Sequence, residues 1–268
     1  MTLPERKDTW DGGTSYEPYV GRWSRLVARQ FLTWLAVPPG ARWLDSGCGT
    51  GALSQTILET ASPHSVLGID LSEGYLAFAR QQIQDPRAAF RLGDAQARLV
   101  ESAAYDAVAS GLVLNFVPQP SQALSEMIRA VRRGGTVAAY VWDYAGQMQL
   151  IRHFWDAAVA LDGAACAFDE GQRFPLCQPE PLRQLFQKAQ LEQVEVRSID
   201  IPTPFRDFDD YWSPFLGGQG PAPGYAMSLS EDRRIALRDH LRATLPIAPD
   251  GSIHLIARAW AVRGVRKN

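Results

Sequence analysis

Short apolar runs alternate with longer segments of helical period between about residue 41 and residue 141, and this alternation most constrains the fold. It is typical of βαβ units, in which parallel strands alternate with helices. Strands that are buried on both faces are continuously apolar, and Gly, Asp or Ser closes each run here. The pattern predicts five strands, at residues 41–46, 65–70, 88–92, 105–110 and 136–142.

The rest of the chain predicts a return to the sheet after an insertion. Helices are expected between the strands, with Ser72 as an N-cap, and further along at 148–161, 180–189 and 231–243. Residues 194–199 and 252–262 alternate apolar and polar side chains, and these two strands can pair antiparallel. Residues 201–250 predict a lid. We expect a single domain over 1–268, with a helical cap at 1–40 and an α/β core at 41–200 and 251–268.

Composition narrows the class of protein. A chain of 268 residues, 46% hydrophobic, can bury the core of one large domain. Its net charge of -2 argues against the basic surface that a nucleic acid partner requires. No run approaches the roughly 18 apolar residues that span a bilayer, and no leader segment is evident. Three cysteines without a CxxC pair predict no metal. We expect a soluble, cytoplasmic protein without membrane insertion; the oligomeric state stays undefined.

Three alternate glycines, Gly47, Gly49 and Gly51, lie where the first predicted strand passes into a helix. Glycine lets the backbone turn sharply and pass close to a ligand. The helix N-terminus that follows suits either a dinucleotide pyrophosphate or the carboxylate of a bound amino acid. The spacing satisfies the loose dinucleotide fingerprint, and Asp70 stands where a ribose-binding acid belongs. Both NAD and S-adenosylmethionine are therefore candidate ligands.

Three features favour S-adenosylmethionine over NAD. Asp45 lies in the loop, where a carboxylate would repel pyrophosphate but attract a sulfonium ligand that carries an ammonium group. Asp94 follows the third predicted strand, well placed for the exocyclic amine of an adenine across the carboxyl edge of the sheet. The antiparallel pair at the end of the chain differs from the six parallel strands of a dinucleotide domain.

Five motifs together define a resemblance over residues 41–200: Leu-Asp-Ser-Gly-Cys-Gly-Thr-Gly at 44–51, Gly-Ile-Asp-Leu-Ser at 68–72, Gly-Asp-Ala at 93–95, Tyr-Asp-Ala-Val at 105–108 and Arg-Arg-Gly-Gly-Thr at 132–136. In these the chain resembles class I S-adenosylmethionine-dependent methyltransferases, in particular the small-molecule group that includes the ubiquinone and menaquinone biosynthesis enzymes. The resemblance implies a Rossmann-like doubly wound sheet of seven strands, mostly parallel with the last strand antiparallel, plus the helical lid. Ser46 departs from the pattern, because relatives often carry an apolar or acidic residue there.

The resemblance also implies a cofactor site. The glycine loop with Asp45 would pass the methionine portion of S-adenosylmethionine, and Asp70 would take the ribose hydroxyls. Asp94 and Ala95 would frame the adenine, against which Leu71 would pack. Ser110, at the end of the fourth strand, resembles the segment that touches the methionine portion. The alternative for the three aspartates is that they only cap turns and a helix.

The N-terminal segment offers a further candidate pair, Tyr16 and Arg22. Similar enzymes often use an aromatic-rich N-terminal segment as a cap, and Arg22 could give the methionine carboxylate a bidentate donor. An ordinary amphipathic lead-in to the first helix is the alternative.

Methyl transfer from a sulfonium is an in-line displacement with a neutral leaving group, so alignment and exclusion of water are the main tasks. A hydroxyl or carbon acid acceptor would also need a base, for which Asp143 and Tyr144, just past the fifth strand, are candidates. Asp143 could equally be a strand-end cap. His153 is a poorer candidate, since it lies on the polar face of its predicted helix.

We expect methyl transfer to a small, partly apolar molecule, because the residues after the fifth strand are rich in aromatic side chains typical of small-molecule pockets. The attacked atom of the acceptor, O, N or C, is undetermined. Two other classes stay open. One is an NAD-type or non-catalytic nucleotide-binding module, and the other is a methyltransferase that acts on protein or RNA.

Overall fold

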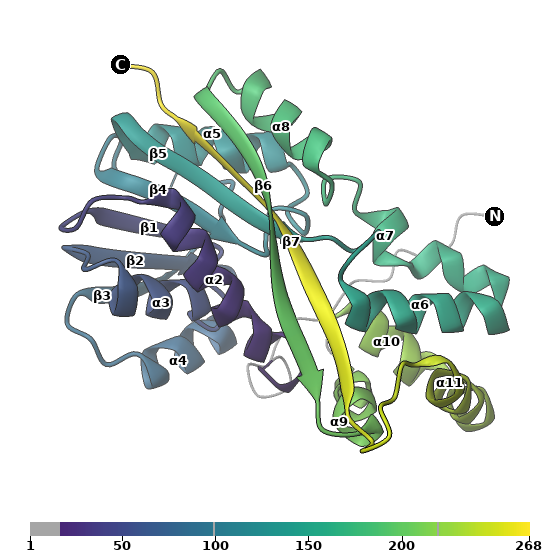
Figure 1. Cartoon of the computed structure of the whole chain (residues 1–268). Helices are drawn as coiled ribbons and strands as arrows, with labels where there is room; N and C mark the ends of the chain where they lie inside the picture. Colours follow the sequence, from purple (N-terminus) through teal and green to yellow (C-terminus); the bar gives the residue numbers. More distant parts are fainter. Residues whose placement is uncertain (1–16, 99, 219) are drawn as a thin grey trace.

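The computed structural model describes residues 17–98, 100–218 and 220–268. In this part of the chain seven strands form one sheet in the order β3-β2-β1-β4-β5-β7-β6 (Figure 1). The strands are β1 (Arg42–Ser46), β2 (Ser65–Asp70), β3 (Ala88–Leu92), β4 (Tyr105–Gly111), β5 (Val131–Trp142), β6 (Glu192–Phe205) and β7 (Ile253–Val265).

The sheet is parallel from β3 to β5, and β7 lies antiparallel between β5 and β6. This confirms the predicted sheet, mostly parallel with an antiparallel last strand. β6 and β7 are longer than predicted; for β6 the reason is that Pro202 suggested that the lid begins there. Proline is tolerated on an edge strand, where its missing N–H faces away from the ladder, and β6 is such an edge.

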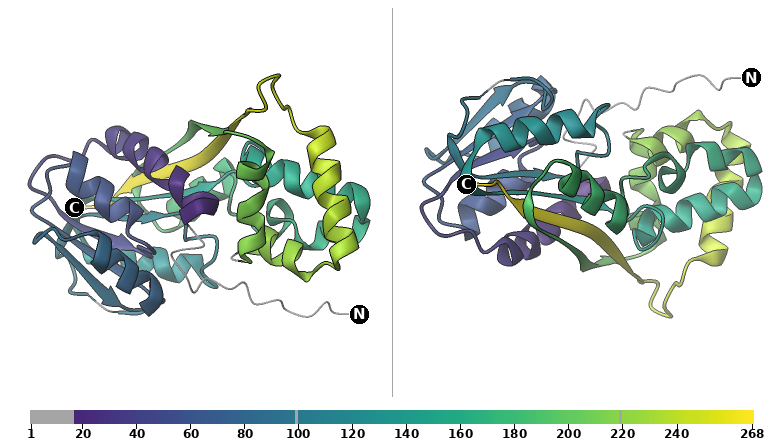
Figure 2. Two further views of the ribbon diagram at one scale, coloured as in Figure 1. Left: turned by 90° about the horizontal axis from the view of Figure 1, so that it is seen from below. Right: turned by 90° about the horizontal axis from the view of Figure 1, so that it is seen from above.

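Helices cover both faces of this sheet. α2 (Arg22–Leu35) lies on one face and α5 (Pro120–Ala130) on the other (Figure 2). α2 buries Trp23, Val27 and Phe31, spaced four residues apart on one side of the helix. The Phe31 ring lies 4.7 Å from that of Tyr140 in β5, which fixes the helix to the sheet. The other core helices are α3 (Ala52–Thr60), α4 (Glu73–Gln82) and α8 (Pro179–Lys188), with the short η1 (Glu17–Gly21) before α2.

A separate group of helices, the helical cap, lies beyond the carboxyl end of the sheet (Figures 1 and 2). It consists of α6 (Gln149–Leu161), η2 (Gly163–Phe168), α7 (Glu170–Arg173), α9 (Phe208–Trp212), η3 (Ser213–Gly217), α10 (Pro221–Ser228) and α11 (Glu231–Thr244). The predicted lid, 201–250, supplies α9, η3, α10 and α11, and α6 from outside the lid packs against α10 and α11. Phe154 of α6 stacks on Phe215 at 4.6 Å, an apolar contact that periodicity within one segment does not reveal. The predicted division into an N-terminal cap at 1–40, a core and a lid stays a prediction.

Candidate functional site

A cavity of about 290 Å³ lies at the carboxyl ends of the parallel strands. This is the edge where ligands of open α/β sheets gather. Its walls come from the loops after β1, β2, β3 and β4, from the end of β5, and from the start of α2. The cavity therefore has a cofactor half, along the β1–β3 loops, and an aromatic half, along β4 and β5.

The glycine loop of the cofactor half turns on three left-handed residues, with φ of 78° at Gly47, 51° at Gly49 and 87° at Gly51. Glycine adopts this conformation without a steric penalty. A Cβ on Gly47 would lie 2.5 Å from Val113, and one on Gly51 would lie 2.7 Å from Ile83, so these two glycines also serve packing. A Cβ on Gly49 would meet nothing within 4 Å. Gly49 lines the cavity, so its bare backbone faces space that a ligand can enter.

Asp45 is fully buried beside this loop and borders the cavity. Its Oδ2 accepts a 2.7 Å hydrogen bond from the side-chain hydroxyl of Ser54 in α3, which ties the loop to that helix. Its Oδ1 has no hydrogen-bond partner in the described part of the chain. Burial, and to a smaller degree the negative charge of Asp70, raises the pKa of Asp45 to about 7. A cationic ligand group would favour the ionised carboxylate.

Asp70, at the end of β2, holds the loop in place. Its Oδ2 accepts a hydrogen bond from Gly49 N (2.8 Å), and its Oδ1 accepts one from Ser72 N (2.9 Å). Burial raises its pKa despite these two bonds. Both carboxylate oxygens keep a second lone pair for ligand hydroxyls. The next residue, Leu71, is 68% exposed at the cavity, where an apolar ring would cover it.

Asp94 and Ala95 line the cavity in the loop after β3, as the resemblance implies. Asp94 Oδ1 accepts a hydrogen bond from Gln96 N at 2.8 Å, so this carboxylate also forms a turn. The turn and ligand interpretations of these aspartates are compatible, because one oxygen can serve the backbone while the carboxylate borders the cavity.

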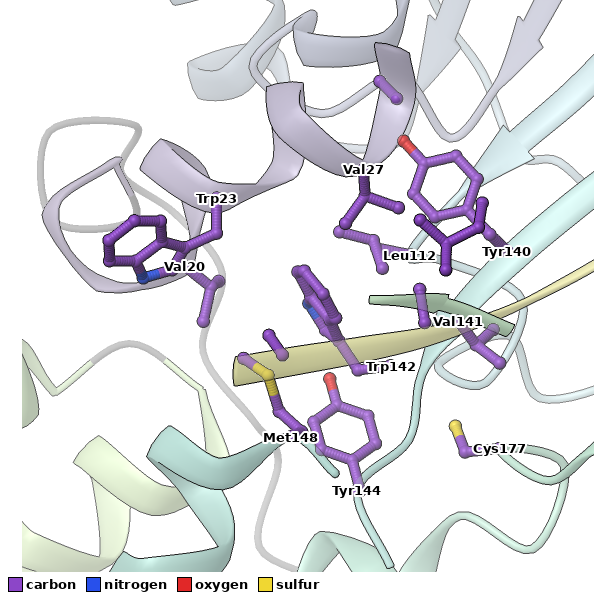
Figure 3. Close-up of a cluster of buried hydrophobic side chains, with 14 of the residues drawn as sticks. Val20, Trp23, Val27, Leu112, Tyr140, Val141, Trp142, Tyr144, Met148 and Cys177 are labelled. Carbon is purple, nitrogen blue, oxygen red and sulfur yellow. The ribbon is translucent and has the colours of Figure 1, made fainter. Parts of the chain in front are cut away.

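Aromatic side chains form the other half of the cavity: Phe116, Tyr140, Trp142 and Tyr144. Leu112, between them and the glycine loop, has a left-handed φ of 62°, a strained conformation for a leucine. Its N–H donates to the Tyr140 carbonyl oxygen at 2.8 Å, which helps to hold the strained turn. Figure 3 shows the Trp142 indole between the start of α2 and Leu112, with the Tyr144 ring next to it.

The two candidate bases differ in position. Asp143 does not line the cavity, and its Oδ2 accepts a hydrogen bond from Gln147 N at 2.9 Å, which is the strand-end cap considered from the sequence. Tyr144 lines the cavity and packs against Phe174 at 5.7 Å. Ser110, a predicted cofactor contact, is buried and does not line the cavity, and its Oγ has no partner among the described residues. His153 lies outside the wall.

Arg22 does not line the cavity. Its guanidinium forms an ion pair with Asp210 at 2.9 Å and lies over the rings of Trp23 and Phe205, at 4.5 Å and 4.8 Å. In this arrangement Arg22 joins the start of α2 to the helical cap. A contact between Arg22 and the cofactor stays a prediction. Tyr16, its companion in that prediction, lies outside the described residues.

The sequence interpretation did not assign the α2 side of the cavity, to which Val20 and Ser24 contribute. These residues are four apart and so share one helical side, a signal that becomes informative only when the helix is known to cross the cavity. Tyr140 was also missed. It stands two residues before Trp142 in β5, so both side chains point to the same face of the sheet.

The charged side chains of the cavity wall are all acidic. Its described lining residues include Asp45, Asp70 and Asp94 but no Arg, Lys or His.

No group of His, Cys, Asp and Glu suited to a metal ion occurs among the described residues. In the same part of the chain, no helix is long and apolar enough to cross a bilayer.

Comparison with known families shows which class of protein this part of the chain resembles. Residues 44–139, which contain the glycine loop and the ends of β2 to β4, match the family described as "Methyltransferase domain". This segment is therefore similar to the methyltransferase domains whose cofactor is S-adenosylmethionine.

Relatives extend the comparison along the chain. Trans-aconitate 2-methyltransferase of Variovorax paradoxus is 30% identical over 116 residues, covering 43% of this chain and 44% of that protein. The chain thus spans less than half of the length of this relative. Demethylmenaquinone methyltransferase of Lysinibacillus sphaericus is 26% identical over 214 residues, 74% of this chain and 87% of the relative.

Among solved structures, phosphoethanolamine N-methyltransferase 2 of Haemonchus contortus, in complex with phosphomonomethylethanolamine and S-adenosylhomocysteine, superposes with a TM-score of 0.60. The two share 16% identity, and the match covers 95% of this chain and 57% of the other. At this identity the likeness establishes a common fold.

Proposed function

We propose that this chain binds S-adenosylmethionine in the cofactor half of the cavity and transfers its methyl group to a small, neutral, partly apolar molecule in the aromatic half. One observation carries the proposal: a single cavity joins the glycine loop to the aromatic wall of β5. A cofactor and an acceptor bound in these two halves would meet inside the protein, away from bulk water.

The residues present fit this cofactor. The open side of Gly49 leaves room for the methionine portion, and the unpartnered Oδ1 of Asp45 offers an acceptor to its ammonium group. Asp70 has lone pairs left for the ribose hydroxyls, and Leu71 presents an apolar surface to the adenine. When bound, S-adenosylmethionine supplies an electrophilic methyl group on a sulfonium with a neutral leaving group. A pyrophosphate fits poorly, because Asp45 would face it with negative charge.

The acceptor is inferred from the wall that it would touch. An acceptor with several carboxylates needs cationic partners when it is desolvated, and the described lining residues supply three carboxylates instead. A neutral ring compound matches the aromatic half better, as in a quinone-like or other natural product molecule. The net charge of -2 also argues against an RNA acceptor. The cytoplasmic location expected from the sequence stays a prediction.

For a hydroxyl acceptor, Tyr144 is the better candidate for proton transfer because it lines the cavity, whereas Asp143 is held in a turn. An acceptor that needs no base would make Tyr144 a wall residue only. Comparing turnover of Tyr144→Phe with a phenol and with an amine acceptor separates these roles. Loss on the phenol alone, on the order of 100-fold, indicates a base.

The proposal is tested by incubating the protein with S-adenosylmethionine labelled in its methyl group and three acceptor panels. The panels contain neutral quinols and phenols, polycarboxylates such as trans-aconitate, and total protein and RNA. Label is expected in the first panel, and an equal preparation of Asp70→Ala should transfer little. Transfer only to polycarboxylates, protein or RNA would contradict the proposed acceptor class.

A further inference from the structure

The indole of Trp142 carries a donor for which the protein provides no acceptor. Trp142 is 2% exposed, and its Nε1 has no hydrogen-bond partner in the part of the chain that the structure describes. A buried N–H without a partner destabilises a fold. Because Trp142 lines the cavity, a bound molecule can supply the missing acceptor.

The surroundings of Trp142 hold the ring at this place. Trp142 pairs with Ala259 of β7, and Ala257 and Ala261 lie on the same face of that strand. These small side chains leave space for an indole between the sheet and the segment from η1 to α2, where Val20 and Trp23 lie (Figure 3). The ring is therefore fixed by packing on a rigid strand, which is what orienting a substrate requires.

We infer that Trp142 is a positioning and specificity residue, which donates its indole N–H to an uncharged oxygen of the methyl acceptor. This inference rests on the proposed function. The indole N–H is only a donor, so it selects a carbonyl, ether or hydroxyl oxygen over a hydrogen-bond donor. The surrounding wall selects against a carboxylate, because the described lining residues have acidic groups and no cation. The acceptor class is thus a ring compound that carries a carbonyl or phenolic oxygen.

Trp43 in β1 offers a matched control. Its side chain is 1% exposed, and its Nε1 likewise has no partner among the described residues, but Trp43 does not line the cavity. The variants Trp142→Phe and Trp43→Phe each remove one buried, unpartnered indole N–H and leave an aromatic ring. A merely structural effect of losing the indole should therefore occur in both.

The experiment measures binding of 1-tetralone and of tetralin, which has a methylene in place of the carbonyl, to protein saturated with S-adenosylhomocysteine. For each protein the ratio of the two dissociation constants is taken, so that general loss of packing cancels. We expect Trp142→Phe to reduce the preference for the ketone by about fivefold to tenfold, as for loss of one buried hydrogen bond. Trp43→Phe should keep the ratio of the unchanged protein, and 1-naphthoate should bind at least tenfold more weakly than 1-tetralone.

The outcomes separate the two proposals. If S-adenosylhomocysteine binds but the ratio is the same in all three proteins, or 1-tetralone does not bind, the assignment of Trp142 is overturned while the cofactor proposal stands. If S-adenosylhomocysteine does not bind the unchanged protein, the proposed function itself fails. Should Trp142→Phe not fold, tighter binding of 1-naphthoate than of 1-tetralone to the unchanged protein would still contradict the inference.

Discussion

The two halves of the cavity are built from different kinds of interaction. The cofactor half is formed by backbone conformation and short polar side chains, namely three glycines at positive φ and three aspartates at strand ends. In the aromatic half, large rings pack against neighbouring elements, as Tyr140 does against Phe31 of α2 and Tyr144 against Phe174. The first half is constrained by a ligand common to a whole class of proteins. The second half is open to variation, because any packed set of rings can form a wall.

This difference predicts how substitutions in each half behave. In the cofactor half, small changes should reduce the affinity for S-adenosylmethionine sharply. Substitutions of similar size in the aromatic half, or outside the cavity, should alter acceptor preference or stability and leave cofactor affinity unchanged.

The largest effect is expected from Gly49→Ala compared with Gly51→Ala. The new methyl group at position 49 would enter the space left for the cofactor, so its affinity should fall on the order of 100-fold, about 2.7 kcal/mol. The left-handed backbone strains an alanine at either position, but at position 51 the methyl group would also press on Ile83, so stability should fall further there, by about 1–2 kcal/mol. Calorimetry and thermal unfolding of both variants measure the two effects. Equal cofactor affinities would contradict the assignment of Gly49.

Asp70→Ala should weaken S-adenosylmethionine binding about 30-fold. The change removes the contact proposed for the ribose hydroxyls and also frees Gly49 N, which Asp70 holds in place. Asp85→Ala, a change of the same type at a partly exposed position that does not line the cavity, is the control. Cofactor affinity of Asp70→Ala equal to that of the control would overturn the role of Asp70.

Asp45→Asn should separate stability from binding. The ordinary pKa of an aspartate is 3.8, and in the folded protein that of Asp45 is about 7. Between these values the unfolded chain is ionised while the folded carboxyl keeps its proton. The ligand-free protein therefore loses stability as pH rises from 4 to 7, and the loss is complete above pH 7.

Asparagine carries no charge, so ligand-free Asp45→Asn should be more stable than the unchanged protein by about 1–2 kcal/mol at pH 8. The gain should disappear at pH 4. Its affinity for S-adenosylmethionine should nevertheless fall, on the order of tenfold, because the carboxylate for the ammonium group is gone. Denaturant unfolding at both pH values tests this, and a variant less stable at pH 8 would contradict the account.

The smallest effect is expected at Arg22. Arg22→Ala removes a partly buried ion pair and two ring contacts between α2 and the helical cap, so stability should fall by about 1 kcal/mol. Cofactor affinity should stay within about twofold, since Arg22 does not line the cavity. Arg29→Ala, which breaks an exposed pair with Glu59, should change stability by less than about 0.5 kcal/mol. A marked loss of cofactor affinity only in Arg22→Ala would support the contact with the methionine carboxylate.

The parallel strands of the core and the position of the glycine loop could be predicted because their causes are local. Alternating apolar runs, a loop of glycines and an aspartate at a strand end each report backbone geometry within a few residues. The N-cap at Ser72, for example, is confirmed by its hydrogen bond from Tyr75 N.

The helical cap and the aromatic half depend on contacts between distant segments. Phe154 meets Phe215 across 61 residues, and nothing in the period of either segment indicates the other. Likewise, the ion pair of Arg22 with Asp210 joins two segments that lie 188 residues apart in the sequence. Polar side chains near a cavity were therefore easy to identify as candidates, but their partners were not predictable from the sequence.

The most direct test of the central claim is calorimetric titration of the purified protein with S-adenosylmethionine, S-adenosylhomocysteine and NAD. The account predicts micromolar binding of the first two ligands, about one per chain, and no binding of NAD. Binding of NAD alone would contradict the interpretation of Asp45 and, with it, the proposed methyl transfer.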